Sequence, residues 1–292
     1  TNLIEEKGSD VVRYWTSTSN LGADTAYSDE IFKIGQKLIT KLFNASKFAS
    51  MQFDVVEKHS LPDISCTNRS SQDDLANFFA NITESSDLWI ISKLKKTIEI
   101  ATTQFEKFEY AKAREAIEDF FWNDLCDNYL EIVKVRSYGL DSQKLENIEL
   151  SEDQKKTIQN QQISAILTLK LTLNTILKLF APFTPHLCEE LYSNLFENEF
   201  KTTRSINNLG NWPKSELLPF SEKSLEVGEE SLKVIAQVRK FKSDSNISMK
   251  TTVNLIKVSS EIDLSPAIED LKNVCNSIDI SLSVGEFSCH VE

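Results

Sequence analysis

The chain has 292 residues, enough for about two domains, and 40% of them are hydrophobic, which excludes a chain disordered throughout. The formal charge of −12 argues against nucleic-acid binding through an overall basic field, so the local charge distribution decides. Only 7 glycines occur where average usage gives about 20, and doubly wound nucleotide domains need glycines beside the pyrophosphate. We therefore expect a helix-rich protein without a nucleotide-binding core.

Helical periodicity dominates as far as about residue 243. A long helix is predicted to begin near Ser28, because serine is a favoured N-cap residue. Its apolar positions recur every three or four residues and define one buried stripe: Ile31, Ile34, Leu38, Leu42, Ala45 and Ala49. Residues 54–72 are predicted to form a loop, followed by helices at 73–80 and 87–105.

The next predicted helices are longer. One runs over 110–136, with several bulky aromatic side chains. Ser151 and Gln154 form a Ser-x-x-Gln capping box, which predicts a helix from there to Phe180, where two prolines follow. Another helix is predicted over 186–197.

The pattern changes after an irregular connector at 200–220. A helix over 221–242 precedes β-branched alternation at 251–258, a short helix at 266–277 and a strand pair near 279–291. The predicted fold class is mainly α: a helical bundle followed by a small α+β C-terminal unit. We divide the chain into a linking segment 1–27, a bundle 28–199, the connector 200–220 and the α+β unit 221–292.

Scattered cysteines and the absence of targeting signals predict a cytoplasmic protein. There is no Cys-x-x-Cys pair, no signal-peptide core and no uninterrupted apolar run approaching the ~18 residues of a membrane span. The five thiols, expected to be reduced, are Cys66, Cys126, Cys188, Cys275 and Cys289. Because the chain starts at Thr1 and its methionines are Met51 and Met249, we expect it to be a piece of a longer protein.

Local charge departs from the overall balance in two places. Residues 31–53 contain no acidic residue but four lysines, Lys33, Lys37, Lys41 and Lys47. Phe48 directly follows the last of these lysines. Lysines beside an aromatic ring are typical of sites that hold single-stranded RNA, although a solvated lysine face opposite the core gives the same pattern. A second basic run lies over 233–250 and has one acid, Asp244, against five basic residues: Lys233, Arg239, Lys240, Lys242 and Lys250. The preference of a helix C-terminus for cations accounts for Lys240 and Lys242 but not for Arg239 and Lys250.

Catalytic and metal-binding patterns are lacking. His186 with Glu189 and Glu190 only faintly resembles a metalloprotease motif, because the second ligand histidine is missing. No phosphate-binding loop, nucleophile elbow or metal-ligand spacing occurs. We expect no catalytic residue, no metal and no cofactor in this chain.

Five blocks of sequence resemble class I aminoacyl-tRNA synthetases, and specifically the valyl-tRNA synthetase family. They are KGSDVVRYWTSTSNLGADTAYS (7–28), TKLFNASKF (40–48), FFWNDLCDNYLEIVK (120–134), LFAPFTPH (179–186), and the run from SI (205–206) to WP (212–213). The first resembles the segment after the KMSKS loop, and the second resembles the lysine-rich helix of the valyl branch. The resemblance implies an anticodon-binding bundle from the C-terminal part of such an enzyme, whose catalytic and editing domains would precede Thr1.

The resemblance also implies roles for particular residues. Phe48 would stack on an anticodon base, Lys41 and Lys47 would meet phosphates or base edges, Leu130 would give apolar contact and Glu131 would accept from a base amino group. Three basic residues of the C-terminal unit would touch the tRNA backbone: Arg239, Lys240 and Lys242. Glu30 stands where some family members have an arginine, so this chain departs from the family pattern at that additional contact.

The expected partner is therefore valine tRNA, bound through its anticodon loop by a monomer without membrane contact. ATP would serve the full enzyme, which ligates valine to its tRNA, while this chain would be inactive by itself. Two alternatives stay open: a helical scaffold whose lysine face meets an acidic protein, and a cofactor-free all-α enzyme.

Overall fold

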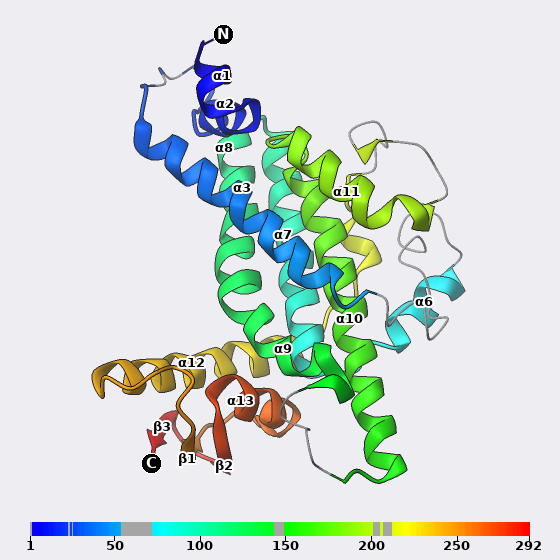
Figure 1. Ribbon diagram of the computed structural model, residues 1–292, viewed down its shortest axis with the longest axis vertical. Helices are drawn as coiled ribbons and strands as arrows, with labels where there is room; N and C mark the ends of the chain where they lie inside the picture. Colours follow the sequence, from blue (N-terminus) through cyan, green and yellow to red (C-terminus); the bar gives the residue numbers. More distant parts are fainter. Residues whose placement is uncertain are drawn as a thin grey trace. The chain divides into compact units, whose positions relative to one another are not determined.

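The computed structural model describes residues 2–22, 24, 26–53, 72–142, 149–200 (backbone only for 72 and 197–200), 205–206 and 212–292. The described residues confirm the predicted fold class, a mainly α chain that ends in a small sheet with helices (Figure 1). Residues 54–71 of the loop predicted over 54–72, and much of the connector at 200–220, lie outside the described residues, and the next helix begins at Gln72.

The chain forms two compact units. Unit 1 comprises residues 1–80, 94–123 and 166–218, and unit 2 comprises residues 81–93, 124–165 and 219–292. These units are defined by spatial contacts and each combines several segments of the chain. The predicted sequential domains, 1–27, 28–199, 200–220 and 221–292, therefore stay a prediction.

Unit 1 begins with α1 (Asn2–Lys7), α2 (Ser9–Thr16) and α3 (Asp29–Ser50), and α3 packs on α2 and on α11 (Pro185–Phe200). The predicted N-cap is confirmed, because the Ser28 hydroxyl accepts a hydrogen bond from the Ile31 N–H at 3.4 Å. The buried stripe of α3 differs from the prediction at its N-terminal end: Phe32 and Gly35 are buried, whereas Ile34 is 42% exposed. Gly35, three residues before Leu38, belongs to the buried stripe, but glycine has no side chain and hydrophobic periodicity therefore does not identify it.

The middle of the chain is helical, as predicted, with one difference in geometry. After α6 (Gln72–Ala80) and α7 (Ser85–Glu106), the predicted helix over 110–136 is present as α8 (Tyr110–Asp119), the π-helical segment η1 (Phe120–Tyr129) and α9 (Leu130–Tyr138). A π-helix pairs each residue with the fifth one along, so side chains of η1 follow a different angular step from those of an α-helix.

The helix α10 (Glu152–Phe180) confirms the predicted capping box. The Ser151 hydroxyl accepts from the Gln154 N–H at 3.3 Å, and the Gln154 side chain accepts from the Ser151 N–H at 2.9 Å. By length and composition α10 is the one described helix apolar enough to cross a membrane, but 89% of its most apolar window is buried within the protein. Such burial is typical of a core helix.

The C-terminal part of unit 2 contains α12 (Glu222–Asp244), β1 (Val253–Ser259), η6 (Ser265–Ala267), α13 (Ile268–Cys275), β2 (Ser277–Ser283) and β3 (Ser288–Val291). The two short helical turns η2 (Gly139–Asp141) and η5 (Ser215–Leu217) complete the described elements. The strands expected to pair near 279–291 do not pair with each other. The sheet order is β2-β1-β3, with β1 parallel to β2 and antiparallel to β3.

Candidate nucleic-acid interface

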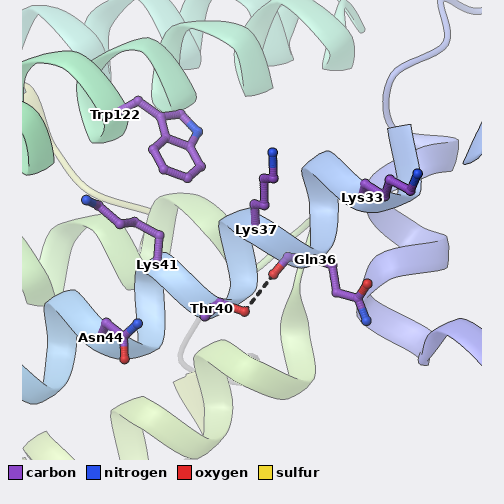
Figure 2. A pocket seen from close by; sticks show the side chains of 7 residues that line it. All are labelled: Lys33, Gln36, Lys37, Thr40, Lys41, Asn44 and Trp122. Atoms are coloured by element: carbon purple, nitrogen blue, oxygen red, sulfur yellow. Dashed lines mark hydrogen bonds between the residues drawn. The ribbon is translucent and has the colours of Figure 1, made fainter. Parts of the chain in front are cut away.

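A basic groove runs along α3 in unit 1. It has a volume of about 600 Å³, and its lining consists of one helical face of α3 together with one side chain of η1 (Figure 2): Lys33, Gln36, Lys37, Thr40, Lys41, Asn44 and Trp122. Figure 2 shows the Trp122 ring across from α3, with the side chains of Lys37 and Lys41 to either side of it. The lining contains no carboxylate.

The three lysines of the groove stand four residues apart, which places them on one face of the helix. Lys33 and Lys37 are exposed and Lys41 is half-buried. None of the three forms an ion pair or hydrogen bond with a residue that the structure describes. Their positive charges are therefore directed to solvent or to a ligand.

Lys47 and Phe48 lie in the last two turns of the same helix. Phe48 is seven residues after Lys41, so its half-buried ring follows the lysine face, while the exposed Lys47 lies nearer the edge of that face. Phe43, four residues before Lys47, is 50% exposed. Unit 1 thus brings together three of the predicted RNA-binding residues: Lys41, Lys47 and Phe48.

Unit 2 holds the remaining predicted contacts. Leu130 is half-buried and Glu131 is exposed at the start of α9, where the Glu131 carboxylate lies 3.5 Å from the Lys134 ammonium. The Arg239 guanidinium donates to the Asn128 side chain at 3.2 Å and to the Asp127 carbonyl at 3.0 Å. Arg239 therefore lies within about one helical turn of Leu130 and Glu131, and its guanidinium is half-buried.

Two neighbouring lysines of α12 differ sharply. Lys240 is exposed, in agreement with a role at the surface. Lys242 is 2% exposed, and its ammonium donates to the carbonyls of Met249 at 3.1 Å, Thr251 at 2.7 Å and Cys275 at 2.8 Å. This geometry contradicts the predicted RNA contact of Lys242, because all three donors are used inside the unit.

The comparison with protein families assigns the chain to a family. Residues 87–258, more than half of the sequence, match the family described as the anticodon-binding domain of tRNA ligase. The chain belongs to this anticodon-binding family.

Individual relatives extend the similarity over nearly the whole anticodon-binding chain. It is 39% identical over 277 residues to the valine–tRNA ligase of Ehrlichia ruminantium (strain Welgevonden), which covers 94% of the chain and 30% of that relative. The valine–tRNA ligase of Wolbachia pipientis wMel is 38% identical and covers 99% of the chain, which includes α3. That of Rickettsia conorii is 39% identical over 97% of the chain. The chain spans about 30% of the length of these relatives.

Trp122 is the groove residue of the anticodon-binding chain that sequence reasoning missed. Trp122 is half-buried, whereas its neighbours Phe120 and Phe121 are 1% and 0% exposed. We expected Trp122 to contribute bulk to a regular helix. Because η1 is π-helical, α-helical periodicity does not place this side chain, and its adjacency to α3 depends on tertiary packing.

His186, which with Glu189 and Glu190 faintly resembles a metalloprotease motif, lies in the first turn of α11. The Asp10 carboxylate accepts from the backbone N–H groups of His186 at 3.3 Å and Leu187 at 2.7 Å, so Asp10 caps this helix from α2. Among the residues that the structure describes, no three His, Cys, Asp or Glu side chains are grouped to hold a metal ion.

Proposed function

We propose that this chain binds valine tRNA through the anticodon loop, with Lys41, Lys47 and Phe48 of α3 as its main contact. The observation that carries the proposal is the acid-free C-terminal half of α3, which places Lys41, Lys47 and Phe48 close together in a member of an anticodon-binding family. The relatives named above are valine–tRNA ligases, which supports valine tRNA as the partner.

The residue roles follow from chemistry and exposure. Phe48 offers a ring on which an unstacked anticodon base packs, and Lys41 and Lys47 supply charge for phosphates or base acceptors. Glu131, exposed on α9, is suited to accept from a cytosine amino group, with Leu130 beside it as an apolar surface. Phosphate contacts then provide most of the affinity, and base contacts provide the sequence preference.

The longer protein to which we assign this chain joins valine to its tRNA with ATP. The chain spans about 30% of the length of its relatives, and its sequence has no acid–base or nucleophile–base motif at a defined spacing, so we propose that this chemistry lies outside the chain. We further propose that the protein acts in the cytoplasm and that this chain is monomeric.

The decisive test is a titration of the chain with valine tRNA and with the same tRNA altered only in its anticodon, at two salt concentrations. We expect weaker binding of the altered tRNA. The substitution Phe48→Ala should reduce the binding free energy for valine tRNA by about 1–3 kcal/mol, the range for one base–aromatic stack. Lys41→Ala and Lys47→Ala should weaken binding, with a shallower salt dependence wherever the lysine contacts a phosphate.

Equal binding of both tRNAs at both salt concentrations would contradict anticodon reading by this chain. Preference for an acidic protein over tRNA would favour the scaffold alternative. Valine-dependent exchange of pyrophosphate into ATP by this chain would show that catalysis does not lie elsewhere.

A further inference from the structure

The lysine face of α3 continues well beyond the predicted anticodon contacts, toward the start of the helix. Lys33, Lys37 and Lys41 line one groove, and Phe48 follows on the same face. Fifteen residues separate Lys33 from Phe48, about 22 Å at 1.5 Å per residue. One unstacked base does not extend over this length, so the N-terminal half of the face has no assigned ligand.

We propose that the groove between α3 and η1 is a second tRNA-binding site, in which Lys33 and Lys37 hold backbone phosphates and the Trp122 ring packs against a base or ribose. This proposal rests on the proposed function and deepens it, because it adds a site next to the anticodon contacts. The groove and all its lining residues belong to unit 1.

The electrostatics of the groove favour a polyanion. Like charges four residues apart destabilise a helix by a few tenths of a kcal/mol per pair, and α3 carries two such pairs in Lys33–Lys37 and Lys37–Lys41. No described carboxylate lies within ion-pair distance of these lysines to offset the repulsion. A ligand that brings several negative charges in a row offsets it, and a nucleic-acid backbone is such a ligand.

Trp122 distinguishes this groove from a solvated row of lysines. Its indole N–H donates to no residue that the structure describes. Its ring packs edge-on against the buried Phe121, with 5.6 Å between the ring centroids, and also borders the groove, so part of it stays accessible. Aromatic faces bind bases without regard to sequence, because every base has a π face. The volume of about 600 Å³ is within the range of pockets that hold a molecule of nucleotide size.

Three variants and one matched control test the site by titration of the chain with valine tRNA. Lys33→Gln/Lys37→Gln should weaken binding and reduce the slope of log affinity against log salt by roughly 1.4 to 1.8, the contribution of two phosphates. Trp122→Leu should weaken binding about 5- to 150-fold, whereas Trp122→Phe, which retains a ring, should stay within a few-fold of wild type. The control Lys107→Gln/Lys112→Gln removes the same charge from exposed positions of unit 1 outside the groove and should leave affinity and salt slope nearly unchanged.

The outcomes separate this proposal from the proposed function. If the wild-type chain discriminates the anticodon while the groove variants bind like the control, the second site is wrong and the anticodon module stands. If the groove variants weaken binding of both tRNAs equally and Phe48→Ala has no effect, the groove binds RNA and the anticodon contact is wrong. Thermal unfolding of Trp122→Leu identifies a folding defect, and in that case the lysine pair and Trp122→Phe decide.

Discussion

Arg136 on α9 and Asp270 on α13 form a buried bidentate ion pair across 134 residues of chain. The Arg136 Nε lies 2.7 Å from Asp270 Oδ1, and Nη2 lies 3.0 Å from Oδ2. The same guanidinium donates to both oxygens of Asp87 on α7, at 2.8 and 3.0 Å. Burial alone would lower the pKa of Arg136, but the carboxylates of Asp270 and Asp87 hold it well above its usual range. This network joins three helices of unit 2.

Removal of the central cation should be far more damaging than removal of one carboxylate charge. We expect Arg136→Met to lower the free energy of unfolding by about 3–5 kcal/mol, because it leaves two unpaired buried carboxylates. Asp270→Asn should cost about 1–3 kcal/mol, since Arg136 keeps Asp87. Lys155→Met, which breaks an exposed pair with Glu152, is the control and should cost less than about 1 kcal/mol. Urea denaturation measures all three, and equal costs for Arg136→Met and Asp270→Asn would contradict this order.

The two lysines at the end of α12 should separate stability from binding. Lys242→Met leaves three carbonyls without their shared donor, so we expect a loss of about 1–3 kcal/mol of stability. Lys240 is exposed, so Lys240→Gln should leave thermal unfolding unchanged. The substitution should lower tRNA affinity modestly through the loss of a contact with the tRNA phosphate backbone. A Lys242→Met chain of wild-type stability would mean that the buried ammonium is dispensable.

The contact between α2 and α3 should be sensitive to a single methyl group. A Cβ atom at Gly35 would lie 2.7 Å from Tyr14 Cδ1 and 3.1 Å from Cγ. The Tyr14 ring is buried, and its hydroxyl accepts from Arg114 at 3.1 Å, which restrains it from moving away. Overpacking should therefore outweigh the better helix propensity of alanine, and Gly35→Ala should lose about 1–2 kcal/mol. A double-mutant cycle with Tyr14→Leu measures the coupling, and strict additivity would count against the clash.

Sequence patterns predicted the parts of this fold that are decided locally. The Ser28 cap and the Ser151–Gln154 box depend on a few neighbouring residues, and both are present. By contrast, Gly35 is buried because Tyr14 approaches it from another helix. Trp122 borders the groove because η1 is π-helical and lies next to α3. The sheet order likewise depends on β1 lying between two strands, which alternation along the chain does not reveal. Among the candidate site residues, Lys242 was misassigned because its exposure cannot be inferred from charge.

A buried lysine on α10 should make stability depend on alkaline pH. Burial lowers the pKa of Lys178 from 10.5 to about 8. Between these values the unfolded chain binds more protons than the folded one, so the free energy of unfolding contributed by this group rises with pH, by about 3 kcal/mol at most. The penalty for burying the ammonium is fully present below about pH 8. Lys178→Met should remove this rise, and urea denaturation of both chains at pH 7 and pH 10 measures it. Parallel pH dependences would contradict the assignment.

The order in which a ribosome makes this chain has a consequence for the Arg136 network. Asp87 and Arg136 are synthesised 49 residues apart and can meet early, whereas Asp270 emerges 134 residues after Arg136. Pairings between distant parts of a chain form late, because the intervening loop must be ordered first. During that interval the guanidinium has one carboxylate partner, and the surface that later receives α13 is uncovered. The maturation of unit 2 is therefore completed by its last-made helix, and nascent chains halted before Asp270 should be the ones most readily cut by proteases.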